Sequence, residues 1–169
     1  MQILYLMCGW SFSGKSHIAG GISKMTGAKI IALDKLNEER GIDNNREISI
    51  ADWESTHKIA VQQLKIYLDE GKSVIIDDTN PLFTLRERFR KVAKQKGLHT
   101  TIIYIDVPIE EIEKRINEIE KNDQRHIAPL SARKNLMSIF ERPNPKIEDV
   151  IVYDPRTDLD IWLKENFKS

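Results

Sequence analysis

The sequence predicts an α/β layer fold built on a parallel sheet. Short apolar runs in the chain are continuous rather than alternating, which is the pattern of strands buried on both faces. Segments with helical spacing separate these runs, so strand and helix alternate. At 169 residues, about 40% of them hydrophobic, the chain is long enough for one compact core, and we expect a single domain over residues 1–169.

The expected strands, of which the second is the weakest, are Ile3 to Cys8, Lys29 to Leu33, Ser73 to Ile76, Thr101 to Ile105 and Val150 to Tyr153. The expected helices are Lys15 to Met25, Ala51 to Glu70, Leu85 to Lys96, Ile109 to Glu120, Leu130 to Phe140 and Asp158 to Phe167. Glycines follow the first three helices, where a left-handed terminal residue is favourable. The polar stretch Asn37 to Ile50 lacks periodicity and is expected to be an exposed loop.

The composition excludes some partners. Lysine plus arginine equals aspartate plus glutamate at 26 each, so no overall positive charge indicates nucleic-acid binding, and no basic tail indicates an anionic membrane. The single cysteine, Cys8, cannot form an intramolecular disulfide and is expected to be a buried, inert thiol. Because Ile3 to Cys8 is too short for the apolar region of a signal peptide and no longer apolar run exists, we expect a cytoplasmic protein.

The stretch GWSFSGKS, Gly9 to Ser16, fits the pattern G-x-x-x-x-G-K-[ST] at every fixed position. It follows a strand and precedes a helix, where backbone N–H groups and the helix dipole favour an anion. We therefore predict a phosphate site in which Lys15 reaches the terminal phosphates and Ser16 places its hydroxyl on Mg²⁺. The residues expected to contact the nucleotide in this loop are Gly9, Ser11, Ser13, Gly14, Lys15, Ser16 and His17.

Carboxylates follow two of the predicted strands. VIIDDTN, Val74 to Asn80, ends in Asp77 and Asp78, one of which is expected to serve the magnesium while the other caps the next helix. The pattern does not choose between them. Asp34 ends the weak second strand, where it either caps a helix or accepts a proton from a substrate hydroxyl. Ligands bind at the carboxyl ends of strands in open α/β sheets, so these groups are expected to face one crevice.

A second polar stretch, Lys121 to Ala128, suggests a lid over residues 115–130. Arg125 is expected to stabilise transferring phosphate charge from this lid. Arg115 fits either the same role or a salt bridge with its glutamate neighbours on the helix. Trp10 and Phe12 in the phosphate loop could touch a base or shield the loop, and the histidines show no metal-binding spacing.

Together, GWSFSGKS, LDKL, DDTN and the arginine-bearing lid resemble the polynucleotide kinase-like, AAA_33-type small P-loop kinases. The resemblance covers nearly the whole chain. It implies a three-layer P-loop NTPase fold with a five-stranded parallel sheet in order 2-3-1-4-5, ATP with Mg²⁺, and transfer of the γ-phosphate to a hydroxyl. It also implies that Asp34 is the general base, Asp78 the strand-end aspartate and Arg125 the lid arginine.

The chain departs from that family at the acceptor side. Polynucleotide kinases carry an arginine shortly after the general base, whereas here Lys35 follows Asp34 and Arg40 is the nearest arginine. Residues 34–52 hold six acidic and three basic residues, so this segment would repel a polyanion. The acceptor is therefore either a small hydroxylated molecule or a nucleic-acid 5′ end. A nucleotide-binding switch and a metal-dependent hydrolase are alternative functions that use the same phosphate loop.

Overall fold

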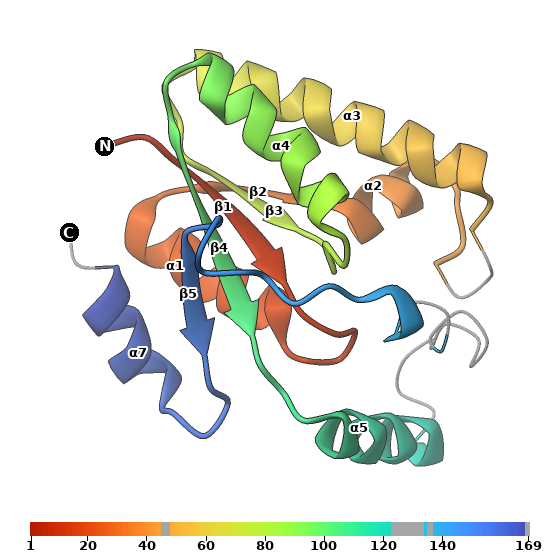
Figure 1. The fold of residues 1–169 in the computed structure, drawn as a ribbon. Coiled ribbons are helices and arrows are strands. Elements are labelled where there is room, and N and C mark those ends of the chain that lie inside the picture. The colour runs from red at the N-terminus through yellow and green to blue at the C-terminus, as the bar shows by residue number, and fades with distance from the viewer. Residues whose placement is uncertain (45–47, 123–133, 135–136, 168–169) are drawn as a thin grey trace.

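The computed structural model describes residues 1–44, 48–122, 134 and 137–167. Its strands are β1 (Ile3–Cys8), β2 (Lys29–Ala32), β3 (Val74–Asp77), β4 (His99–Ile105) and β5 (Val150–Tyr153). They form one five-stranded sheet in the order β2-β3-β1-β4-β5, and every neighbouring pair is parallel. The predicted fold class and strand order are therefore confirmed (Figure 1).

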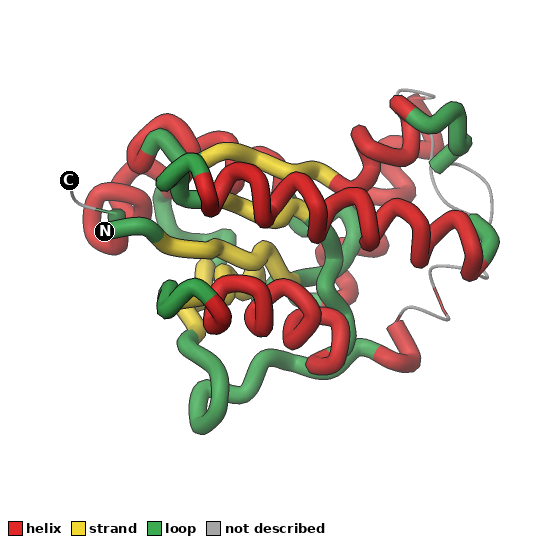
Figure 2. The backbone as a smooth tube through the Cα atoms, turned by 90° about the horizontal axis from the view of Figure 1, so that it is seen from above, coloured by secondary structure: helices red, strands yellow, loops and turns green. Residues whose placement is uncertain are grey.

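The described helices are α1 (Lys15–Thr26), α2 (Leu33–Glu39), α3 (Ile50–Asp69), α4 (Phe83–Gln95), α5 (Ile109–Asn122) and α7 (Leu159–Asn166). Helices α3 and α4 cover one face of the sheet, and α1 and α7 cover the other (Figure 1). The view from above in Figure 2 shows the strands enclosed between these two helical layers. Among the described helices, none combines the length and apolar character needed to span a membrane.

The core has two halves, one on each side of the sheet. In β1, Leu4, Leu6 and Cys8 pack with the residues of α3 and α4, whereas Tyr5 and Met7 pack with those of α1 and α7. Both sets are at most 7% exposed. This two-sided burial is the physical reason for the continuous apolar runs in the sequence. Cys8 lies in this core as expected, and burial raises the pKa of its thiol to about 12, so the thiol is unreactive.

The second strand and the segment after it differ from the sequence expectation. Strand β2 ends at Ala32, and Leu33 begins helix α2 instead of ending the strand. The predicted loop at Asn37 to Ile50 is wrong at its start, because residues 37–39 are helical and Asn37 is buried. This helix spans only two turns, so its apolar positions, Leu33 and Leu36, are too few to reveal a period.

The helix predicted at Leu130 to Phe140 lies mostly outside the described residues. Residue 134 and residues 137–139 are helical, and Phe140 is not. Beyond it, the segment leading to β5 is attached to α4 by a buried ion pair. Arg86 Nε donates to Glu148 Oε1 at 2.8 Å, and both side chains are 1% exposed. Arg86 also donates to the carbonyl oxygens of Asn80 and Glu141, so one arginine connects the end of β3, α4 and the approach to β5.

Candidate functional site

The loop between β1 and α1 has the backbone geometry of an anion cradle. Gly9, Phe12 and Gly14 have positive φ angles of 151°, 64° and 95°. A Cβ at Gly9 would lie 2.9 Å from the carbonyl oxygen of Ile105, so only glycine fits there without displacing the loop. Helix α1 begins directly after Gly14 with no side-chain cap and no acidic residue in its first turn. Its first N–H groups are therefore available to an anionic ligand.

Lys15 extends back over this loop. Its Nζ donates to the carbonyl oxygen of Trp10 at 2.7 Å, and the residue is buried. Burial lowers the pKa of the ammonium group, while the carboxylates of Asp77 and Asp78 raise it. A cation buried beside carboxylates at a helix N-terminus is suited to neutralise the charge of a bound phosphate.

The carboxylate nearest the phosphate loop is Asp77, the last residue of β3. It shares a hydrogen bond with the Ser16 hydroxyl. Burial raises the pKa of Asp77, and the Ser16 hydroxyl and the charge of Lys15 act in the opposite direction. A hydroxyl and a carboxylate side by side are hard oxygen ligands, the kind that Mg²⁺ prefers alongside water and phosphate oxygens. The described residues contain no cluster of three or more His, Cys, Asp or Glu side chains arranged to hold a metal.

Asp34 and Asp78 lie at adjacent strand ends on the other side of Asp77. Ala32 is the register partner of Asp77, Asp34 follows Ala32 in the first turn of α2, and Asp78 directly follows β3. Asp34 is accessible to solvent on one side. Neighbouring protein atoms nevertheless raise its pKa by desolvation, and the negative charge of Asp78 raises it further. The two carboxylates therefore interact electrostatically with each other, and Asp34 also interacts with Lys15.

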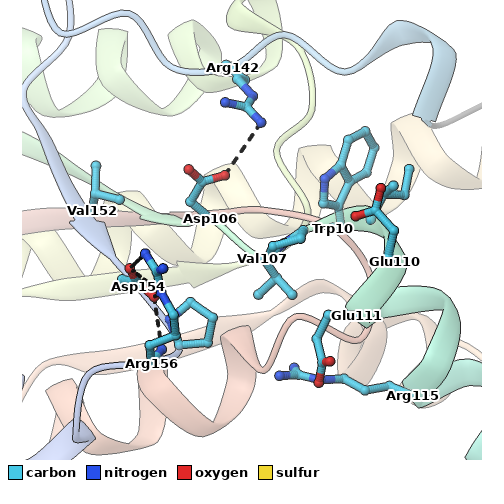
Figure 3. Close-up of a pocket in the computed structure, with 13 residues that line it drawn as sticks. Trp10, Asp106, Val107, Glu110, Glu111, Arg115, Arg142, Val152, Asp154 and Arg156 are labelled. Carbon is cyan, nitrogen blue, oxygen red and sulfur yellow. Dashed lines mark hydrogen bonds and ion pairs between the residues drawn. The ribbon is translucent and has the colours of Figure 1, made fainter.

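A cavity of about 870 Å³ opens on the opposite side of the phosphate loop, beyond the ends of β4 and β5 (Figure 3). It is lined by Trp10, Asp106, Val107, Pro108, Ile109, Glu110, Glu111, Arg115, Arg142, Val152, Asp154, Pro155 and Arg156. Arg142 pairs with Asp106 across one wall at 3.6 Å. Apolar side chains and paired charges thus surround a space large enough for a nucleoside.

Arg115 and Trp10 connect this cavity to the phosphate loop. Arg115 Nη1 donates to the Phe12 carbonyl oxygen at 3.1 Å, and its Nε donates to Glu111 at 3.2 Å. It therefore forms the helix salt bridge and also supports the loop backbone, a contact that the sequence did not indicate. The Trp10 ring lies 4.2 Å from the ring of Phe140, centroid to centroid, and lines the cavity.

The predicted site residues are thus largely brought together. Gly9, Ser11, Ser13, Gly14, Lys15, Ser16 and His17 form the loop and first turn, and Asp34, Asp77 and Asp78 border it. Ser13 is buried, and its hydroxyl has no hydrogen-bond partner in the described part of the chain, whereas His17 is exposed. Arg125, and with it residues 123–130 of the proposed lid, lies outside the described residues.

Two polar residues at the site were missed by sequence reasoning. Asn80, with φ 45°, donates from its side chain to the Met7 carbonyl oxygen at 2.8 Å and so holds the turn after β3 against β1. His57 on α3 faces Asp78, with 3.8 Å between its Nε2 and an Asp78 carboxylate oxygen. The sequence feature that could have identified His57 as buried is its position on the apolar face of α3, in line with Ala60 and Leu64.

A parallel sheet in this order, with a glycine-rich loop and buried lysine between its central strand and first helix, defines a P-loop NTPase fold. The family model described as AAA domain, AAA_33, matches residues 4–143 of the chain. The chain therefore belongs to the AAA_33 family.

Solved structures with the same fold include three kinases. A sugar kinase from Janibacter sp. HTCC2649 is 23% identical with a TM-score of 0.70, over 98% of this chain and 91% of that one. The APS kinase of Mycobacterium tuberculosis, in complex with AMPPNP and APS, is 21% identical with a TM-score of 0.70, over 97% and 94%. A gluconokinase from Sinorhizobium meliloti 1021 is 16% identical with a TM-score of 0.66, over 98% and 89%. Comparison with curated proteins finds no significant match.

Proposed function

We propose that the protein is an ATP-dependent kinase that transfers the γ-phosphate to a hydroxyl group of a small molecule. The observation that carries this proposal is the position of Asp34, an accessible carboxylate in the first turn of α2, directly after β2, and within electrostatic reach of the phosphate-loop Lys15. A nucleotide switch needs the phosphate loop but has no use for a proton acceptor beside it. The kinases with the same fold support this choice.

The nucleotide binds across the phosphate loop. The N–H groups at the start of α1 and the ammonium group of Lys15 hold the phosphates. The cavity beside Trp10 and Arg115 takes the nucleoside. The structure of the APS kinase with AMPPNP supports ATP as the donor. Ser16 and Asp77 would hold Mg²⁺, which supplies positive charge to the phosphate oxygens.

In the transfer step, Asp34 orients the acceptor hydroxyl and accepts its proton. A bond forms between the acceptor oxygen and the γ-phosphorus, while the bond from this phosphorus to the β–γ bridging oxygen breaks and ADP leaves. Lys15 stays on the phosphate oxygens and stabilises the charge that moves to the leaving group. Arg125, assigned by the family resemblance, adds a second positive charge from the lid.

The test is transfer of label from ATP carrying a radioactive γ-phosphate to a panel of sugars, polyols, nucleosides, aminoglycosides and 5′-hydroxyl oligonucleotides. We expect label on one class of acceptor in the wild type. In Asp34→Asn we expect at least about a hundredfold lower turnover, with ATP affinity within about twofold of the wild type. The control is Glu39→Gln, an exposed carboxylate at the other end of the same helix, which should behave like the wild type.

One outcome would contradict the kinase assignment, and a second would revise the role of Asp34. Bound ATP without label on any acceptor would favour the regulatory switch, with slow or incidental hydrolysis. Label on an acceptor with normal turnover in Asp34→Asn would keep the kinase but remove Asp34 as the proton acceptor.

A further inference from the structure

The pair Asp34 and Asp78 has a role beyond proton transfer that can be argued from its surroundings. Asp77 is hydrogen-bonded to Ser16 and so belongs to the magnesium side of β3. Asp78, one residue further, faces the opposite side, toward α3. The contact of Asp77 with Ser16 and that of Asp78 with His57 separate the surroundings of these two neighbours. Asp78 is therefore available to a ligand together with Asp34.

A buried histidine, His57, lies next to Asp78. It is 1% exposed, and neither of its ring nitrogens has a hydrogen-bond partner among the residues that the structure describes. Its ring lies between Trp53, at 3.9 Å, and Phe89, at 5.7 Å, measured between ring centroids. Its Nε2 is directed at Asp78, but the 3.8 Å separation is longer than a hydrogen bond. Leaving a buried polar group unpaired is unfavourable, so a small approach of the two groups would stabilise the site.

The described arginines of the surrounding helices are already paired. Every described arginine on α2, α3 and α4, or at their ends, contacts a carboxylate: Arg40 with Asp52, Arg86 with Glu148, Arg88 with Glu54 and Arg90 with Glu87. Arg40 also donates to Thr56 on α3, which ties it to that helix. An anionic acceptor would therefore meet two carboxylates and no unpaired arginine among the described residues here, and the exposed Lys35 is the cation next to Asp34 in the sequence.

We infer that the acceptor is a polyol without an anionic group, which presents one hydroxyl to Asp34 and a neighbouring hydroxyl to Asp78, and that His57 positions Asp78 by donating a hydrogen bond to it. Carboxylates accept hydrogen bonds and cannot donate them when ionised, so two of them match two hydroxyl donors. This inference rests on the proposed kinase function. The hydroxyl at Asp34 loses its proton and gains the phosphoryl group, and the hydroxyl at Asp78 keeps its proton.

The acceptor class is tested with matched sets of compounds: sorbitol or glucose against gluconate and glucose 6-phosphate, and ribose against ribose 5-phosphate. We expect kcat/KM at least tenfold higher for the uncharged member of the preferred set. Faster transfer to an anionic member, or to a 5′-hydroxyl oligonucleotide, would overturn the inference while leaving the kinase function intact. Label on no acceptor would overturn both.

The roles of Asp78 and His57 are tested by separating the KM for the acceptor from the KM for ATP. Asp78→Asn should raise the acceptor KM at least tenfold and leave the ATP KM within twofold; a raised ATP KM instead would assign Asp78 to the magnesium. His57→Phe keeps the ring between Trp53 and Phe89 but has no N–H group. It should raise the acceptor KM severalfold, and His57→Gln, which retains a donor, should restore part of the loss.

Thermal unfolding of each variant separates positioning from folding. If His57→Phe has a wild-type acceptor KM, His57 does not position Asp78. The double variant His57→Phe with Asp78→Asn gives an independent check. Because His57 acts through Asp78, the acceptor KM of the double variant should equal that of Asp78→Asn alone, and additive effects would overturn the proposed coupling.

Discussion

The charge of Lys15 is opposed by one part of its surroundings and favoured by another. Lys15 is buried, which opposes its charge, and it lies beside Asp77 and Asp78, which favour it. Its Nζ donates a hydrogen bond to the Trp10 carbonyl oxygen, and a phosphate oxygen can replace this carbonyl as the acceptor. The lysine is thus held at the loop in advance of ligand binding, which lowers the conformational entropy lost when a nucleotide binds.

Replacing Lys15 tests the phosphate loop directly. In Lys15→Ala we expect the Kd for ATP to rise at least about tenfold, about 1.4 kcal/mol of binding free energy, because the buried counter-charge is lost. Isothermal titration calorimetry measures this. Lys24→Ala, an exposed lysine in the last turn of the same helix, is the control and should bind like the wild type. Equal ATP affinity in Lys15→Ala would refute the assignment of the loop.

The pH dependence of turnover tests Asp34. Its pKa is raised above 3.8, so the carboxylate takes up a proton as pH falls through a value higher than that of a free aspartate, and the protonated form cannot accept another proton. The acid side of the kcat/KM profile should therefore have its midpoint above 3.8. In Asp78→Asn the midpoint should move to lower pH, because one neighbouring negative charge is removed. An unmoved midpoint would show that another group controls the profile.

Among the larger elements, α4 shows how a buried ion pair differs from an exposed one. Arg86 and Glu148 are both 1% exposed and join α4 to the segment before β5, whereas Arg88 and Glu54 are 42% and 37% exposed. Removing one member of a buried pair leaves an uncompensated charge in the core. The exposed pair is screened by solvent, so its removal changes little. The two arginines are two residues apart on one helix, which makes them a matched comparison.

We expect Arg86→Ala to lower the free energy of unfolding by about 3–5 kcal/mol and Arg88→Ala by less than about 1 kcal/mol. Equilibrium unfolding in urea measures both. The double variant Arg86→Met with Glu148→Leu should recover much of the lost stability, because it leaves no unpaired charge. If both single variants lose a similar amount of unfolding free energy, the buried Arg86 pair contributes no more to stability than the exposed Arg88 pair.

For the whole molecule, charge distinguishes the classes of acceptor. The chain has equal numbers of basic and acidic residues, and the carboxylates of Asp34 and Asp78 lie within electrostatic reach of each other. A protein that binds DNA through 6–10 phosphate contacts loses about 10³–10⁵ in affinity between about 50 and 200 mM salt. We expect kcat/KM for the acceptor to change less than about threefold over this range. A steep fall measured with a 5′-hydroxyl oligonucleotide would instead favour a nucleic-acid acceptor.

The sheet, its strand order and the phosphate loop could be predicted from the sequence. Strands buried on both faces need apolar side chains at every buried position, so β1 and residues 102–105 of β4 form unbroken apolar runs. The loop needs glycine at Gly9 and Gly14, where the backbone has positive φ, and a lysine and serine at the helix start. These requirements are local, so they leave a local pattern. The strand order came from the resemblance that this pattern supports.

Helix α2 and the different surroundings of Asp77 and Asp78 were decided by the tertiary structure. Adjacent aspartates are equivalent in a sequence, and only the positions of Ser16 on one side and His57 on the other distinguish them. Asp78 and His57 are separated by 20 residues and meet because α3 packs across the ends of β2 and β3. The sequence by itself determined the strands, most of the helices and the glycine-rich loop, because local backbone geometry dictates their residues. The proposed acceptor side depends on contacts between distant segments, which only the packing of helices on the sheet creates.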